Sequence, residues 1–107
     1  MKQERLQQLI TFYKEDPTDP FNAYALAMEY LNEDLVVAQK YLEVLLENHP
    51  DYLPTYYHAA AVYIDLGNRE KAKMTYEKGI ALAKKQQNNK AIQELQWAYQ
   101  TFLDDEE

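Results

Sequence analysis

The chain of 107 residues contains no cysteine and no serine. Without cysteine it can form neither a disulfide nor a thiolate metal site, and it has no cysteine nucleophile. Without serine it lacks the nucleophile elbow of serine hydrolases. It has only two glycines, so a glycine-rich phosphate loop is also excluded. These absences remove several common enzyme classes.

Long hydrophobic runs are missing as well. The first ten residues, MKQERLQQLI, are charged and amphipathic, and no continuous apolar stretch follows them. This pattern fits neither a signal peptide nor a membrane span. We therefore expect a cytoplasmic protein with no membrane partner.

Groups that could do chemistry are few. The two histidines, His49 and His58, do not have the paired spacing of a metal site. Neighbouring carboxylates such as Glu33 and Asp34 fit a turn and a helix cap better than a catalytic pair. We expect no catalytic residue, no metal and no cofactor, and hence a protein that is not an enzyme.

Negative charge dominates the chain but is unevenly spread. The formal net charge is −7, and residues 16–50 contain seven carboxylates and one lysine. Lys and Arg gather on one predicted helix, where a solvated face explains them: Arg69, Lys71, Lys73, Lys78, Lys84 and Lys85. Phosphate binding needs clustered cations on a basic protein, so no nucleic-acid partner is expected.

The most informative stretch runs from residue 56 to residue 83. Apolar or small residues recur there three and four positions apart on both sides of a Gly-Asn pair: Tyr56, Ala59, Ala60, Tyr63, Ala72, Tyr76, Gly79 and Ala83. This spacing predicts two amphipathic helices joined by a tight turn. Gly67 suits the left-handed position that ends the first helix, and Asn68 suits the N-cap of the second.

Gly79 stands inside the second of these predicted helices. Glycine in a helix interior costs about 1 kcal/mol relative to alanine, so a compensating interaction is expected. Close approach of a neighbouring helix would supply it.

The same pattern occurs earlier in the chain. Ala23, Leu26, Ala27 and Tyr30 match the first helix of the pair at an offset of 33 residues, and Ala38, Leu42 and Leu45 match the second at an offset of 34. One helical hairpin is therefore repeated. The turn of the earlier copy, at residues 32–34, is one residue shorter and contains no glycine.

This series resembles the tetratricopeptide repeat, a helix–turn–helix unit of 34 residues. Tyr56 takes the first aromatic position, and Pro17 and Pro50 match the prolines that close preceding repeats. Lys84 replaces the proline that would close the later copy, which implies that its second helix runs on. The resemblance implies a small bacterial-type protein of this family: all-α, with antiparallel hairpins stacked as a short solenoid of about six helices.

We expect a single domain over residues 1–107, in five segments. Residues 2–15 form an N-terminal capping helix, 20–48 the first repeat and 53–86 the second. Residues 89–103 form a C-terminal capping helix, with Trp97 partly covering the end of the core, and 104–107 a disordered acidic tail. Asp19 and Asp51 are expected to cap the first helix of each repeat.

The resemblance also implies a function and a site. First helices of such repeats line a concave groove that holds a peptide or protein segment, as in scaffold and adaptor proteins. The groove positions that carry the predicted binding site are Phe21, Tyr24, Met28, Leu31, Tyr57, His58, Ala61 and Ile64. Tyr24, Met28 and His58 replace residues with which some family members grip a peptide's carboxylate, so an apolar or aromatic ligand is expected.

Three alternatives remain open at this point. The C-terminal helix could fold back and bury Tyr57, Ala61 and Ile64 as ordinary core. The groove, or an open end near Trp97 and Phe102, could be buried in a homodimer. The acidic tail could dock on a basic partner, in which case affinity should fall with salt.

Overall fold

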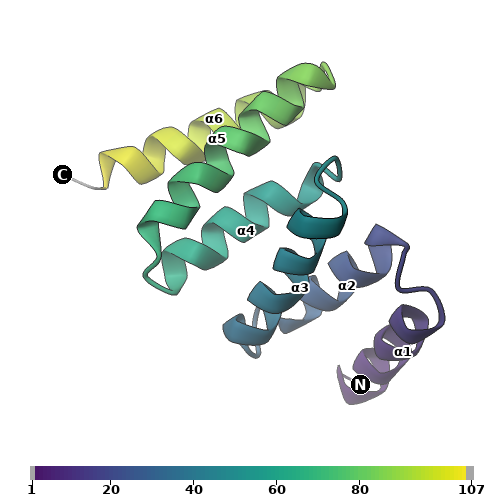
Figure 1. Ribbon diagram of the computed structural model, residues 1–107. Coiled ribbons are helices and arrows are strands. Elements are labelled where there is room, and N and C mark those ends of the chain that lie inside the picture. The colour runs from purple at the N-terminus through teal and green to yellow at the C-terminus, as the bar shows by residue number, and fades with distance from the viewer. Residues whose placement is uncertain (1, 106–107) are drawn as a thin grey trace. The chain divides into compact units, whose positions relative to one another are not determined.

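The computed structural model describes residues 2–105, which form six α-helices and no strand (Figure 1). The helices are α1 (Lys2–Glu15), α2 (Pro20–Tyr30), α3 (Leu35–Asn48), α4 (Pro54–Asp65), α5 (Arg69–Lys85) and α6 (Asn89–Asp104). The fold is an all-α arrangement of helical repeats, as predicted. The chain divides into two compact units, residues 1–55 and 56–107.

In the first unit, α1 packs against α2, and α2 and α3 lie side by side as a hairpin (Figure 1). The buried residues of the hairpin are those of the predicted stripes: Ala23, Leu26, Ala27, Ala38, Leu42 and Leu45. Alanine at half of these positions lets the helix backbones approach closely, while leucine fills the remaining space.

Aspartates begin both helices of this hairpin. The side chain of Asp19 accepts a hydrogen bond from the Phe21 amide at 3.0 Å, and Pro20 is the first helical residue, as predicted. Asp34 accepts from the amides of Val36 and Val37 at 3.1 and 3.3 Å. Each cap pairs amides that the helix itself leaves unpaired.

The predicted N-cap at Asp51 is wrong. The helix α4 begins at Pro54, so its N-cap position falls on Leu53. The Tyr52 amide donates to the carbonyl of His49 at 3.0 Å, which closes a turn with Pro50 and Asp51 at its centre. Asp51 therefore belongs to the turn that precedes the helix.

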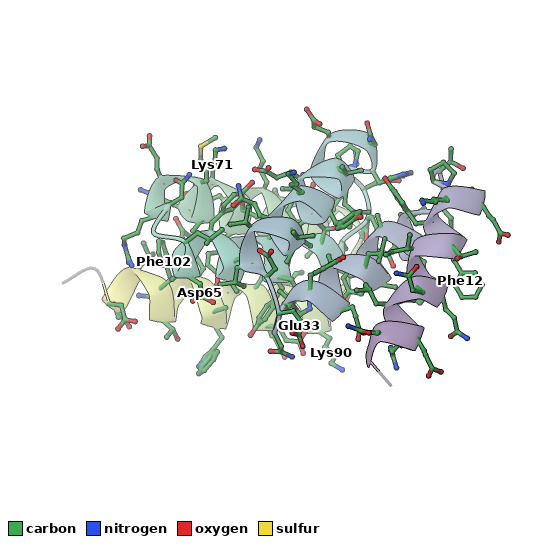
Figure 2. The ribbon with its side chains drawn as sticks, turned by 90° about the horizontal axis from the view of Figure 1, so that it is seen from below. Phe12, Glu33, Asp65, Lys71, Lys90 and Phe102 are labelled. Carbon is green, nitrogen blue, oxygen red and sulfur yellow. The ribbon has the colours of Figure 1, made fainter. Side chains whose placement is uncertain are left out.

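Tyrosine rings from all three helices meet in the first unit. Tyr13 lies edge-on to Tyr41, with ring centroids 5.6 Å apart, and Tyr30 stacks on Tyr41 at 6.0 Å. An ion pair of 3.1 Å between Arg5 and Glu29 adds a contact between α1 and α2. Phe12, in contrast, projects from α1 away from α2 and is exposed (Figure 2).

In the second unit, a tight turn joins α4 to α5. Gly67 has φ of 83°, and Asn68 accepts a hydrogen bond from the Lys71 amide at 3.2 Å. Both roles were predicted from the sequence. Inside α5, a Cβ built on Gly79 would stand 2.7 Å from the Cβ of Tyr56 and 3.4 Å from a methyl group of Leu95. The close approach that Gly79 was expected to allow is therefore confirmed.

The turn from α5 to α6 repeats the turn from α4 to α5. The Asn88 amide donates to Ala83 at 3.0 Å, as the Asn68 amide donates to Tyr63 at 2.8 Å. Asn88 also caps α6 by accepting from the Ala91 amide at 3.0 Å. Gln87, with φ of 57°, stands where the earlier turn has its glycine. A non-glycine residue thus adopts the left-handed conformation here.

The last helix, α6, packs along α5 through aromatic side chains. The Tyr76 ring lies 5.6 Å from that of Tyr99 and 5.9 Å from that of Phe102. The Arg69 guanidinium sits 4.3 Å from the Phe102 ring centroid and donates to the Phe102 carbonyl at 3.1 Å. The Tyr99 hydroxyl donates to Glu77 at 2.6 Å. These contacts fix α6 on α5.

Three expectations about the C-terminus need correction. Trp97 is 72% exposed and does not cover the core, whereas Phe102 is only 4% exposed and is not at an open end. At about 100° per residue, Trp97 lies on the opposite side of α6 from the buried Leu95 and Phe102. The helix α6 includes Asp104, so the predicted end of the helix at residue 103 is one residue too early; residues 106 and 107 lie outside the described residues.

Candidate functional site

Four of the predicted binding residues share one side of α2, which we call the α2 face: Phe21, Tyr24, Met28 and Leu31. Phe21 is 59% exposed, and the other three are half-buried. The opposite side of the helix carries the buried core residues Ala23, Leu26 and Ala27. The α2 face therefore retains accessible apolar surface after the hairpin core has formed.

Tyr52, which sequence reasoning missed, extends the α2 face. Its ring lies edge-on to that of Tyr24, with centroids 5.7 Å apart. It stands in the turn before α4, outside the repeated helical pattern, so only its aromatic character could have drawn attention to it. Burial raises the pKa of both tyrosines, and the nearby carboxylate of Asp19 raises that of Tyr52 further.

The other four predicted residues lie on α4, in the second unit, and we call them the α4 face: Tyr57, His58, Ala61 and Ile64. Tyr57 is 42% exposed, so α6 does not bury it, and the other three are half-buried. The Tyr57 and His58 rings meet edge-on at 5.4 Å. Burial lowers the pKa of His58, because it disfavours the charged imidazolium. His58 is therefore neutral near pH 7.

A third feature was not predicted. An open cavity of about 310 Å³ lies in the first unit, and its lining comes from α1, the end of α2 and the following turn: Gln3, Leu6, Glu29, Tyr30 and Glu33. Residues from α1 and from the turn meet only in the folded unit, so the sequence pattern gave no signal for it.

The described residues offer little for chemistry. Within residues 2–105, no group of three or more His, Asp or Glu side chains is arranged to hold a metal ion. In the same part of the chain, no helix combines the length and apolar character needed to cross a membrane. The surfaces on α2 and α4 are suited to contacts with another molecule.

Comparison with solved structures shows the family. A tetratricopeptide repeat domain protein from Salinibacter ruber, solved in solution, is 41% identical to this chain with a TM-score of 0.76; the match covers 81% of this chain and 89% of that protein. Its crystal structure gives 40% identity and a TM-score of 0.74, covering 78% and 94%. The chain belongs to the tetratricopeptide repeat family.

More distant structures share the fold of this tetratricopeptide repeat protein. A protein from Bordetella parapertussis matches 94% of the chain, and 88% of its own, with a TM-score of 0.80 at 19% identity. MamA matches 98% of the chain, and 68% of its own, with a TM-score of 0.69 at 20% identity. No family model and no curated protein sequence matches the chain. Its relatives are tetratricopeptide repeat domains, which in general mediate protein–protein interaction.

Proposed function

We propose that this tetratricopeptide repeat protein binds segments of partner proteins, on the α2 face in the first unit and on the α4 face in the second. The observation that carries this proposal is the exposure of Phe21 and Tyr57, one large ring on the first helix of each repeat. Exposed aromatic side chains among half-buried apolar ones are typical of protein-binding surfaces. The role requires no catalysis, metal or cofactor, and it suits a cytoplasmic scaffold or adaptor.

The surfaces favour particular ligand chemistry. Neither α2 nor α4 contains a lysine or an arginine, so neither offers a cation for a peptide carboxylate. Aromatic and aliphatic side chains of a partner could instead pack against Phe21, Met28 and Tyr57. Such contacts bury apolar surface, at about 25 cal/mol per Å² removed from water.

Alanine variants with matched controls test the proposal. Peptides are first selected for binding to the full chain from a random peptide library displayed on phage. Phe21→Ala and Tyr57→Ala should each weaken binding of the selected peptides about tenfold or more, as expected for central aromatic residues. Val36→Ala and Met74→Ala truncate side chains that are 58% and 50% exposed on α3 and α5. These two controls should bind normally.

Two results would overturn the proposal. In one, the controls weaken binding as much as the test variants do. In the other, no peptide is enriched. Met28→Glu provides a further check, because it places a charge on the α2 face and should abolish binding. If Met28→Glu instead lowers the free energy of unfolding by several kcal/mol, Met28 belongs to the core.

Trp97 favours a second candidate function, homodimerisation. It is a large apolar side chain that is 72% exposed on α6, among polar neighbours. In this case a second copy would bury it, and light scattering after size exclusion would show a dimer that Trp97→Gln converts to a monomer. A monomeric wild type at all concentrations would remove this candidate.

A further inference from the structure

The central part of the chain is almost without positive charge. Residues 15–68 contain ten carboxylates and a single cation, Lys40. This stretch includes both α2 and α4, and neither helix carries Lys or Arg. A partner segment on the α2 face therefore meets no Lys or Arg from α2 itself, and the nearby Glu29 is paired with Arg5 of α1. Electrostatic complementarity selects for partners of opposite sign and speeds their association.

One carboxylate lies beside the aromatic rings of the first unit. Asp19 is exposed at the N-cap of α2, two residues before Phe21. Burial, and then the Asp19 carboxylate, raise the pKa of Tyr52, whose ring lies edge-on to that of Tyr24 at 5.7 Å. Two half-buried tyrosine rings, an exposed phenylalanine and a carboxylate thus occur together at the start of the α2 face.

Such a combination suits one class of side chain. Guanidinium and ammonium groups are attracted to aromatic faces, and more strongly when a carboxylate is close enough to pair with them. Arginine fits better than lysine, since its planar group can stack on a ring while donating hydrogen bonds to a carboxylate. The Asp19 carboxylate already accepts the Phe21 amide, so a neutral segment would add no charge-assisted contact to it, and an acidic segment would be repelled.

We infer that the segment held on the α2 face is cationic: an arginine or lysine lies against Tyr24 and Tyr52 and pairs with Asp19, and a neighbouring apolar residue packs on Phe21. This inference rests on the proposed function and specifies its partner class, a basic segment with apolar residues.

The first unit provides a well-matched pair of variants to test it. Asp19→Asn removes the charge, and asparagine is as good an N-cap as aspartate, so α2 should keep its cap. Asp34→Asn makes the same change at the N-cap of α3, away from the tyrosine pair. Both variants raise the net charge by one, so a difference between them reports position and not overall charge.

The probe is the set of peptides selected from the random phage-displayed library on the full wild-type chain, then synthesised and measured by fluorescence anisotropy. Enriched peptides should carry Arg or Lys beside an aromatic or aliphatic residue. Asp19→Asn should weaken their binding up to about fivefold, the upper end for an exposed ion pair, and Asp34→Asn should have little effect. Raising the salt from 0.05 to 0.5 M should also weaken binding, on the order of several-fold.

The outcomes separate this inference from the proposed function. Neutral or acidic enriched peptides, or equal binding to the two asparagine variants, would overturn the inference. If binding by those peptides still depends on Phe21, the proposed function stands and only the inference is wrong. If no peptide is enriched, both the proposed function and the inference are wrong.

Discussion

Gly79 of α5 lies directly against Tyr56 of α4, so closely that a Cβ on the glycine would stand 2.7 Å from the Cβ of the tyrosine. Atoms at that distance overlap, and Tyr56 cannot withdraw its Cβ by changing rotamer. The contact explains why a residue unfavourable to helices occupies the middle of α5. The close packing of α4 against α5 therefore depends on the absence of a side chain at Gly79.

Gly79→Ala should therefore destabilise the protein, although alanine is the better helix former by about 1 kcal/mol. Overpacking costs about 1–3 kcal/mol, and a clash with a fixed Cβ belongs at the upper end of that range. We expect a net loss of about 1–2 kcal/mol in urea unfolding. Lys78→Ala, at the exposed neighbouring position, should change stability by less than about 0.5 kcal/mol. A stabilised Gly79→Ala variant would show that the helices can separate freely.

In the two equivalent turns of the second unit, adding a glycine and removing one should have opposite effects on stability. Gln87 is held at φ of 57°, a conformation that costs a non-glycine residue about 1–2 kcal/mol. Gln87→Gly should stabilise the protein by about 0.5–1 kcal/mol, after allowing for the greater freedom of glycine in the unfolded chain. Gly67→Ala should destabilise it by about 1 kcal/mol, for backbone reasons alone, since no atom lies within 4 Å of the added Cβ. Thermal unfolding measures the stability of both variants. Changes of the same sign in the two variants would contradict the equivalence of the two turns.

Arg69 connects the start of α5 to the end of α6. It stacks on Phe102 and donates to a carbonyl of the last helical turn, where a cation is favourable. Arg69→Ala should lower the free energy of unfolding by about 1–2 kcal/mol. Lys73→Ala, another exposed cation of α5, should have little effect. Equal losses in the two variants would mean that charge alone matters and that the contact with Phe102 does not.

His58 should titrate below its ordinary pKa of 6.5, because burial disfavours its charged form. Between the folded and unfolded pKa values the unfolded chain binds more protons, so stability rises with pH across that window. Its contribution is fully present above about pH 6.5 and is lost as the pH falls toward the folded pKa. Proton NMR titration of the two histidine rings checks the direction. A pKa for His58 above 6.5 would contradict the half-buried environment.

The positions and caps of the helices could be predicted from local sequence rules, whereas the surroundings of individual side chains could not. Asp19, Gly67 and Asn68 have roles set by neighbours in sequence, and Gly79 was marked by its cost in a helix. The left-handed conformation of Gln87 was not predicted, because glycine is the usual signal for that conformation. The equivalent positions of Asn68 and Asn88 in the two turns could have indicated it. Asp51 was misplaced because Pro50 and Pro54 divide its segment into a turn and a helix start.

The repeat pattern identified residues of α2 and α4 that lie outside the buried core, and their role in binding stays a prediction. Tyr52 and the cavity beside Tyr30 arise from segments that meet only in the folded unit. Trp97 was expected to cover part of the end of the core, whereas the helical period places it opposite Leu95.

The most direct test of the proposed function is amide chemical-shift mapping by NMR, in which a selected peptide is added to the isotope-labelled full chain. The largest shifts should fall in α2 and α4, and Phe21→Ala should reduce them while Val36→Ala leaves them unchanged. Shifts confined to α5 and α6, or to α1, would contradict the assignment of the binding surface.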